Sequence, residues 1–598
     1  MLTTDFYNII DECLNQLIEK YKNDEQIKRH KNSETGQKAY AFLIWFLEFY
    51  GKTTNYLPYI TDGNDDSSCD IIFEAPDYRR NNRIYYVVQS KWNQRQKILM
   101  ALDSKEVGYA LDNFRTIMRG SKKPTKNDSF NKKLLELQAH IEKNGQVKFI
   151  FLSLCQENAN LDDNVANFKE EFNPVGLEFI DINRIKRDYI ERKYQYKQIT
   201  PDNPLEYTYD PEDTPVTLTV ERPKHHSGIK IDKPFDAYIF LVKPKTIFNL
   251  FKKFGFRLFF KNVRNPIINS EINQQIEKTL IDNPSYFWYY NNGITAITDD
   301  LSNIQARAKQ FELSGFQIIN GAQTVHAIYA AYKNATPREQ NKIDKDVLIT
   351  LRLLESGGKD FDLQVTRYTN SQHPISERDF HANDKVQIRL QNESFNTKFW
   401  YEKRRDEFRG EMPNGIEFIP NFVFAYAYLA YELQQPTTVL KNSHNLMKGN
   451  SKDLLFLSHQ EDGLYELVFN DQTQFEDMLC SIYLLRLLAV STSSGDFEQV
   501  FTTHLIYRLA LFKLIFSQDI NKRYTHIPPI NKKVKELVEK GESTLLLEIF
   551  QFIDDKMTEF LEKPEYQEKW MTESYYEKIK EHFGIPTLKV MNFNINSV

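Results

Sequence analysis

The sequence predicts three regions in one chain: an α/β region at the N-terminus, a mixed α+β region in the middle and a mainly α-helical region at the C-terminus. Helical and strand patterns alternate up to about residue 190, which is typical of α/β folds. A segment at 199–215 then places four prolines among acidic residues and marks a boundary. From about residue 399 onward the apolar periodicity is almost wholly helical. We therefore expect domains at residues 1–198, 216–400 and 401–598.

The composition excludes several classes of protein. The 598 residues carry a formal net charge of -5, which excludes a uniformly basic chain that coats nucleic acid, so any polyanion must bind a local patch. Four cysteines lie far apart without a CxxC pair, which argues against a disulfide framework or a cysteine zinc site. There is no secretory signal pattern, and no apolar run approaches about 18 residues. We expect a soluble, cytoplasmic protein without a membrane segment.

The N-terminal region is predicted to place helices around a β-hairpin. Apolar residues from Phe6 to Ile18 recur at helical spacing, and residues 39–50 form a second, very apolar helix. Two β runs follow at 69–75 and 83–92, and the polar turn between them predicts a hairpin. The remaining predicted elements are two helices and a buried strand, at residues 104–118, 131–143 and 147–154. This element order is that of an α/β sandwich.

The other two regions are predicted more coarsely. Strands are expected in the middle region at 216–220, 237–242 and 347–354. The C-terminal region shows helical periodicity in five segments, at 422–433, 478–490, 504–516, 532–539 and 543–561. We interpret these C-terminal helices as packing or oligomer surfaces. The chain has no GxxxxGK[ST] string, so P-loop ATP hydrolysis is not supported.

The hairpin is the first place where chemistry is expected. If its turn is centred near residues 79 and 80, antiparallel pairing places Asp70 opposite about Gln89 or Ser90. Gln89 and Lys91 are two residues apart on one strand and therefore point to the same face. Asp70, Gln89 and Lys91 are thus expected to converge.

These three residue types suit phosphodiester hydrolysis. An aspartate beside a carbonyl-bearing side chain can hold a Mg²⁺ (or Mn²⁺) ion, so Asp70 and Gln89 are the candidate metal ligands. Lys91 would orient an attacking water or offset charge on a phosphate. The alternative is a structural hairpin with one lysine at a strand end. The loop at 61–66 could supply a further ligand, although a solvated turn is its commoner meaning.

Asp70 is followed nineteen positions later by Gln89-Ser90-Lys91, and this pattern with its surrounding elements resembles the PD-(D/E)XK nuclease superfamily. The resemblance is greatest to the Mrr-type restriction branch, in which glutamine takes the usual acidic position. Members commonly carry another acid on the first core helix, and Glu34 and Glu48 are the candidates here. The resemblance implies a metal-dependent nuclease with Asp70, Gln89 and Lys91 as its catalytic residues.

The middle region carries polar strings between apolar ones. They are KNVR at 261–264, NNG at 291–293, INGAQT at 319–324, TNSQ at 369–372 and RDFHAND at 378–384. Asn-Gly steps permit positive φ and expose backbone amides, and amide side chains both donate and accept hydrogen bonds. Such a surface can contact base edges or phosphates.

These strings resemble the abortive infection phage-resistance (AIPR) domain, whose members share them in this order. The resemblance covers about 215–410 and implies a bacterial anti-phage protein, often with a nuclease-like N-terminal region. Position by position it proposes nucleic-acid or ligand contacts at Lys261, Asn262, Arg264, Asn291, Asn292, Asn320, Gln323, Asn370, Gln372, Arg378, Asp379, Asn383 and Asp384. One departure is Ala322, where glutamine is frequent.

The strings also have a structural interpretation, in which buried Asn and Gln side chains satisfy backbone groups at tight turns. Lys261 and Arg264 are the stronger candidates for anion contact, because cations flanked by aromatic residues suit a nucleic-acid channel. A basic cluster follows at Tyr401, Lys403, Arg404, Arg405 and Arg409. It is interpreted either as a stripe of side chains that contacts successive phosphates or as a solvated helix face.

Three functional hypotheses follow. The leading one is a cytoplasmic antiviral nuclease that cuts nucleic acid, with DNA expected ahead of RNA, and that responds to a phage-derived trigger. The second is a non-catalytic sensor whose central region captures a phage component or nucleic acid. The third is a structural hub that forms a homo-oligomer through its C-terminal helices and loses it when the chain is cut after about residue 400.

Overall fold

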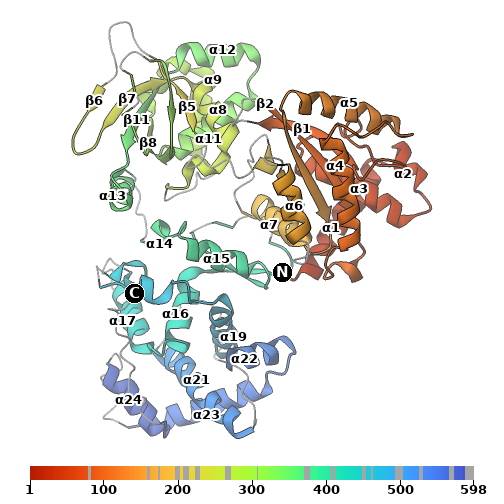
Figure 1. The fold of residues 1–598 in the computed structure, drawn as a ribbon. Helices are drawn as coiled ribbons and strands as arrows, with labels where there is room; N and C mark the ends of the chain where they lie inside the picture. Colours follow the sequence, from red (N-terminus) through yellow and green to blue (C-terminus); the bar gives the residue numbers. More distant parts are fainter. Residues whose placement is uncertain are drawn as a thin grey trace. The chain divides into compact units, whose positions relative to one another are not determined.

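The computed structural model describes most of the chain and divides it into two compact units. The described residues are 1–77, 82–157, 162–172, 176–195, 203–206, 215–221, 229–262, 271–302, 304–305, 308–369, 377–404, 407–408, 412–447, 453–459, 462–491, 503–523, 530–563 and 572–585. The first unit comprises Met1–Ile375 with Phe408–Met412, and the second comprises Ser376–Glu407 with Pro413–Val598 (Figure 1).

The N-terminal part of the first unit is built on a four-stranded sheet in the order β1-β2-β3-β4. Its strands are β1 (Ile71–Asp77), β2 (Asn82–Lys91), β3 (Gln146–Ser153) and β4 (Gly176–Ile180). β1 and β2 form the predicted antiparallel hairpin, while β3 and β4 continue the sheet in parallel. β2 and β3 are long and carry apolar residues on both faces, so both faces of the sheet must be covered by other elements.

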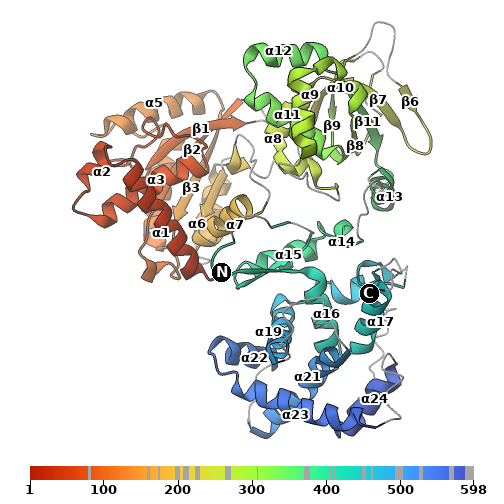
Figure 2. The ribbon, with the colours of Figure 1, turned by 180° about the vertical axis from the view of Figure 1, so that it is seen from behind.

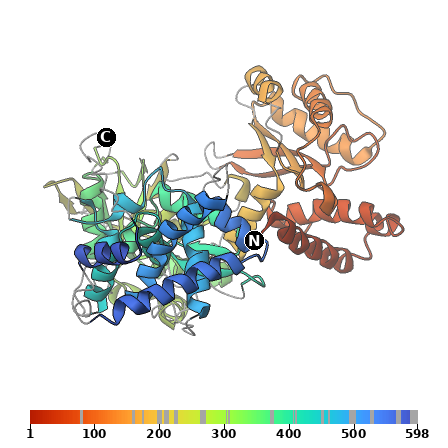
Figure 3. The same ribbon diagram turned by 90° about the horizontal axis from the view of Figure 1, so that it is seen from below.

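Helices cover both faces of this sheet. Phe73 and Tyr86 lie on the face that meets Phe46 of α3 (Glu34–Phe49), with ring centroids of Phe46 and Phe73 6.0 Å apart. The opposite face packs against Phe114 of α4 (Ser104–Met118) through Phe149, at 4.1 Å. Figure 3 shows the two groups of helices on either side of the sheet. The other helices here are α1 (Thr3–Lys20), α2 (Glu25–Arg29), α5 (Asp128–Glu142), α6 (Asp162–Glu171) and α7 (Ile182–Lys193).

The central part of the first unit contains a five-stranded sheet in the order β10-β8-β11-β7-β6. β11 pairs with β8 in parallel, and the other pairs are antiparallel. The strands are β6 (Ile229–Ile231), β7 (Ala237–Val242), β8 (Ile294–Thr298), β10 (Gln317–Asn320) and β11 (Ile349–Glu355). A separate pair joins β5 (Val216–Thr219) to β9 (Gln310–Leu313).

Helices lie against one face of this sheet (Figure 2). Phe240 and Leu351 of the sheet share a core with Phe251 and Val325 of these helices. The helices of this part are α8 (Pro244–Phe254), α9 (Glu271–Asp282), α10 (Phe287–Tyr290), α11 (Ala322–Asn334), α12 (Pro337–Asp346) and α13 (Lys359–Thr369). The presence of both strands and helices confirms the mixed α+β character predicted for the middle region.

The second unit is mainly helical, as predicted. Its helices are α14 (Glu377–Phe380), α15 (Lys385–Ser394), α16 (Asn421–Tyr431), α17 (Pro436–Met447), α18 (Tyr465–Val468), α19 (Phe475–Ser491), α21 (Thr503–Arg523), α22 (Ile530–Glu539), α23 (Thr544–Leu561) and α24 (Glu573–His582). α16 lies at the centre of this bundle, because nearly all of its side chains are buried in one core. The sequence did not predict the short parallel pair of β12 (Phe399–Glu402) and β13 (Glu417–Pro420).

The predicted N-terminal elements are all present within a few residues of their expected bounds, as are the five C-terminal helices. The elements α2, α6, β4 and α7 were not predicted, because they are short or rich in charged residues. Among the described residues, no helix combines the length and the apolar character that crossing a bilayer requires.

Candidate functional site

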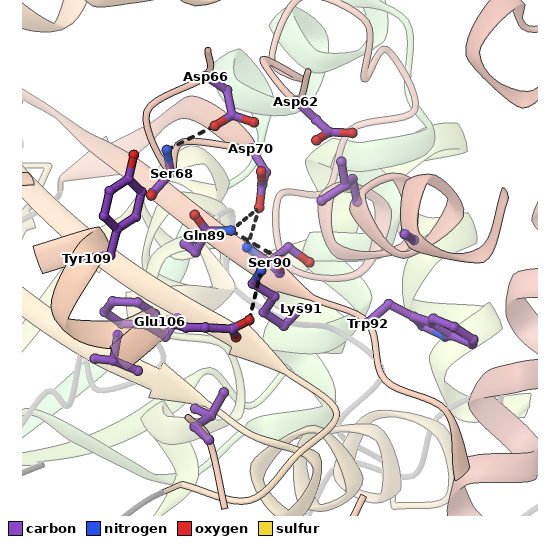
Figure 4. Close-up of a pocket in the computed structure, with 15 residues that line it drawn as sticks. Asp62, Asp66, Ser68, Asp70, Gln89, Ser90, Lys91, Trp92, Glu106 and Tyr109 are labelled. Atoms are coloured by element: carbon purple, nitrogen blue, oxygen red, sulfur yellow. Dashed lines mark hydrogen bonds and ion pairs between the residues drawn. The ribbon is translucent and has the colours of Figure 1, made fainter. Parts of the chain in front are cut away.

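The hairpin brings Asp70 to Gln89 in the predicted register. Ile71 pairs with Val88 at the end of the ladder, and the Asp70 backbone N–H donates to the Val88 carbonyl at 2.9 Å. Asp70 Oδ2 accepts hydrogen bonds from Gln89 Nε2 at 2.8 Å and from the Ser90 backbone N–H at 2.5 Å (Figure 4). Because the Gln89 amide nitrogen faces Asp70, its carbonyl oxygen is the atom left for a cation or a water.

Two further aspartates join Asp70 from the preceding loop. Three carboxylate oxygens, one each from Asp62, Asp66 and Asp70, lie within 4.8 Å of one another. The loop is folded back because the backbone N–H groups of Thr61 and Asp62 donate to the Asp70 carbonyl. Asp66 Oδ1 also accepts from the Ser68 backbone N–H at 2.9 Å. Asp62 is exposed and Asp66 half-buried, and both lie close enough to Asp70 to serve as further ligands.

The clustering raises the pKa of two of these carboxyl groups. Burial is the main reason that the pKa of Asp70 lies well above its usual range, and the charges of Asp62 and Asp66 raise it further. The Ser90 N–H and the Lys91 charge oppose this rise. The pKa of Asp62 is raised first by desolvation in the cleft and then by Asp66, although its side chain is largely exposed. A divalent cation with oxygen ligands would relieve this repulsion.

Lys91 stands at the end of β2 and lines the same cleft as the three acids. Its Nζ lies 3.5 Å from Glu106 Oε1, in the first turn of α4, and both side chains are about half exposed. The cleft has a volume of about 380 Å³ and includes Ser68, Ser90, Trp92 and Tyr109 in its walls. Sequence reasoning missed Glu106 and Tyr109, although their spacing of three on a predicted helix places them on one face.

The two candidate helix acids lie elsewhere. Glu48 Oε1 accepts from Lys20 Nζ at 2.8 Å and from Tyr21 Oη at 2.7 Å. Glu34 forms an ion pair with Lys38 at 3.2 Å. The residues of α3 that line the cleft are the apolar Ala39 and Leu43. The structure therefore brings neither Glu34 nor Glu48 to the described cleft.

The two Asn-Gly strings of the central part hold each other in place. Asn291 Oδ1 accepts from the Gly293 N–H at 2.9 Å, and its Nδ2 donates to Thr324 Oγ1 at 3.0 Å. Asn320 Nδ2 donates to the Thr369 carbonyl at 2.9 Å. A Cβ at Gly293, where φ is 80°, would lie 2.3 Å from the Thr350 carbonyl oxygen. The side chain of Asn291 thus ties the turn before β8 to α11, and that of Asn320 ties the end of β10 to the end of α13.

The remaining central candidates differ in exposure. Asn292 is exposed and Gln323 is half-buried. Lys261 Nζ lies 3.4 Å from Asp362 Oδ2, and Asn262 is buried. Arg264, Asn370 and Gln372 lie outside the described residues.

The last string belongs to a buried polar network in the second unit. Arg378 Nη2 donates to the Glu402 carbonyl at 2.6 Å and lies 3.1 Å from its Oε2. Asp384 Oδ2 accepts from Tyr465 Oη at 2.9 Å. Asn383 accepts from Arg404 Nη2 at 3.0 Å, and Asp379 is buried nearby on α14.

The basic cluster at 401–409 is not what the sequence indicated. Tyr401 is fully buried on β12, and Lys403 and Arg404 are buried beside it. Lys403 Nζ pairs with Glu407 Oε1 at 2.9 Å. The interpretations as a solvated helix face or a phosphate-tracking stripe are therefore wrong for these three residues, while Arg405 and Arg409 lie outside the described residues.

Comparison with known proteins agrees with the resemblance of the central strings. A family model described as AIPR protein matches residues 259–565, which is just over half of the chain. The match covers the NNG, INGAQT and RDFHAND strings and continues into the helical region, but it does not include the N-terminal cleft. Neither the search of curated proteins nor the search of solved structures finds a match. The chain therefore belongs to the AIPR family of abortive-infection anti-phage defence proteins.

Proposed function

We propose that this anti-phage protein is a metal-dependent nuclease whose active site is the N-terminal cleft. The observation that carries the proposal is the convergence of Asp62, Asp66 and Asp70 with Gln89 and Lys91 on one cleft. The element order, the hairpin and the D…QxK pattern resemble the PD-(D/E)XK superfamily, and they support this assignment. The expected reaction is hydrolysis of a phosphodiester bond, with DNA ahead of RNA as substrate.

The residues of the cleft fit a magnesium or manganese ion. Three carboxylate oxygens lie close together, and one belongs to the buried Asp70, whose ionised form is disfavoured unless a cation compensates it. Asp70 and the carbonyl oxygen of Gln89 are the proposed ligands, with Asp62 and Asp66 beside them. Such an ion would polarise a phosphate and lower the pKa of a bound water.

The protein groups have distinct roles in this proposal. Asp70 is held by Gln89 and the Ser90 N–H, so its position is preorganised on a rigid strand. Lys91 would contact the phosphate or orient the attacking water, since its ammonium group donates three hydrogen bonds and carries the compensating charge. Water attacks phosphorus, a new P–O bond forms and the ester P–O bond breaks, leaving a phosphate and a hydroxyl end.

The test uses the purified full-length chain, Mg²⁺ and labelled DNA and RNA. We expect cutting that EDTA stops and that Lys91→Ala abolishes without unfolding the protein. Lys105→Ala is the matched control, because Lys105 is an exposed lysine at the start of α4 and does not line the cleft. Full activity of Lys91→Ala, or cutting that persists in EDTA, would refute the assignment.

A second candidate function is a sensor in which the central part binds a phage component or nucleic acid. The observation that favours it is the family match, which covers the central strings and not the cleft. Asn292 and Gln323 are the central candidates best placed for contact, because Asn291 and Asn320 are engaged within the fold. Loss of phage protection in Asn292→Ala, with protection retained in Asp70→Ala, would favour the sensor over the nuclease.

A further inference from the structure

An exposed tyrosine stands at the rim of the N-terminal cleft. Tyr109 lies on α4, lines the cleft with Asp66 and Lys91, and has 68% of its side chain exposed. Figure 4 shows it on the same helix as Glu106 and beside Ser68. Its ring is therefore accessible to a ligand that enters the cleft.

Contacts on either side fix where Tyr109 stands. One turn before it, Glu106 lies 3.5 Å from Lys91 Nζ. One turn after it, Asn113 Nδ2 donates to Ser68 Oγ at 3.2 Å, on the loop that carries Asp66. The opposite face of α4 is anchored in the core by Val107, Ala110, Leu111, Phe114 and Ile117. The helix is therefore held across the cleft, with Tyr109 between the lysine and the acidic loop.

We propose that Tyr109 stacks on a nucleobase next to the phosphate that is cut, so that the cleft selects nucleic acid with an unpaired base. This inference rests on the proposed nuclease function and adds the substrate class. A base in a duplex is stacked on its neighbours and cannot offer its face to a side chain, whereas a base in a single strand can. The aromatic ring tolerates any base, so it selects strandedness and not sequence.

The arrangement separates the roles of the cleft residues. Asp70 and Lys91 act at the phosphate, which is common to single and double strands. Tyr109 is a specificity residue that touches the substrate away from the reacting atoms. Its loss should weaken binding of single strands and reduce the preference for them over duplex, while the chemistry at the phosphate is retained.

The test measures binding and cutting separately on the full-length chain. Binding of a fluorescein-labelled single strand and of its duplex is followed by anisotropy with Ca²⁺ in place of Mg²⁺, and cutting is followed with Mg²⁺. We expect Tyr109→Ala to weaken single-strand binding by roughly 5- to 100-fold, with Tyr109→Phe close to wild type. Phe552→Ala, an exposed aromatic residue on α23 in the other unit, is the matched control.

An abasic scan identifies the base that is stacked. One abasic position should weaken binding by the wild-type chain as much as Tyr109→Ala does, and it should cause no further loss in Tyr109→Ala. The inference is overturned if Tyr109→Ala binds single strands as tightly as wild type does. It is also overturned if every abasic position weakens binding by Tyr109→Ala as much as it weakens binding by wild type. In either case the nuclease assignment stands if cutting persists. Stacking without cutting would refute the nuclease and, with it, the place of the stacked base next to a cut phosphate, leaving only a base contact by Tyr109. Absence of both binding and cutting refutes both.

Discussion

The N-terminal cleft and the buried network of the second unit both gather charged side chains, but they arrange the charges in opposite ways. In the cleft, Asp62, Asp66 and Asp70 place like charges within a few ångströms, and Lys91 pairs with Glu106. In the second unit, Arg378 pairs with Glu402, and both are buried. Grouped like charge raises the energy of the folded protein until a ligand compensates it, whereas in a buried ion pair the two charges compensate each other.

The comparison teaches which polar motifs to interpret as sites. The RDFHAND string is long and specific to the family, yet Arg378, Asp379 and Asn383 are engaged within the second unit. The D…QxK pattern is short and weak as a string, yet it assembles a cleft with exposed polar groups. A motif that is specific to the family can therefore have a structural role within the fold.

The largest expected effect is on stability in the second unit. Arg378→Ala leaves the buried Glu402 carboxylate without its guanidinium partner, and we expect the free energy of unfolding to fall by about 3–5 kcal/mol. Urea denaturation measures it, with the exposed Arg338→Ala as control. A loss no greater than that of the control would mean that the network is not structural, which breaks the comparison.

Asn291→Ala should have the next largest effect. It removes the hydrogen bond to the buried Thr324 hydroxyl and the acceptor of the Gly293 N–H, so we expect a loss of about 1–3 kcal/mol. Asn292→Ala is the neighbouring control, because Asn292 is exposed and its replacement should change stability by no more than about 0.5 kcal/mol. Equal losses in the two variants would contradict the structural role of Asn291.

Asp70→Asn should increase stability while abolishing cutting. The folded-state pKa of Asp70 is raised, so the folded protein binds a proton more tightly than the unfolded chain does. Stability from this group is therefore greatest at low pH and is lost as the pH rises through the raised pKa. At neutral pH we therefore expect Asp70→Asn to be more stable to unfolding than the wild-type protein.

Denaturation at several pH values, with and without Mg²⁺, checks this prediction. Mg²⁺ should stabilise the wild-type chain most at the higher pH, where the proton no longer competes for the carboxylates, and should have little effect on Asp70→Asn. If the free energy of unfolding depended on pH in the same way in both proteins, the ionised Asp70 would not destabilise the fold. The contrast with the second unit would then be wrong.

The smallest expected change is that of Glu106→Gln. The pair with Lys91 is about half exposed, so its loss should alter stability by less than about 1 kcal/mol. Removing this negative charge frees Lys91 for a phosphate, and we expect the KM for nucleic acid to fall by about two- to fivefold. Steady-state kinetics of wild type and Glu106→Gln measure it. A higher KM would indicate that Glu106 positions Lys91 and does not restrain it.

Much of the fold follows from local sequence patterns. The hairpin register was predictable, since strand periodicity and a short polar turn together determine which residues face each other. The long helices of the second unit were predictable for the same kind of reason, because their apolar residues recur at helical spacing. The pair of β12 and β13 was not, since parallel strands of four residues carry too little pattern.

The candidate site shows where local patterns stop being informative. The sequence by itself determined that Asp70 and Gln89 meet, because they are neighbours across one hairpin. Only the tertiary structure decided that Asp62 and Asp66 join them, that Glu34 and Glu48 do not, and that Glu106 and Tyr109 of α4 complete the cleft. These residues meet through the folding-back of a loop and the packing of a helix on a sheet, which depend on the whole core and not on the spacing between them.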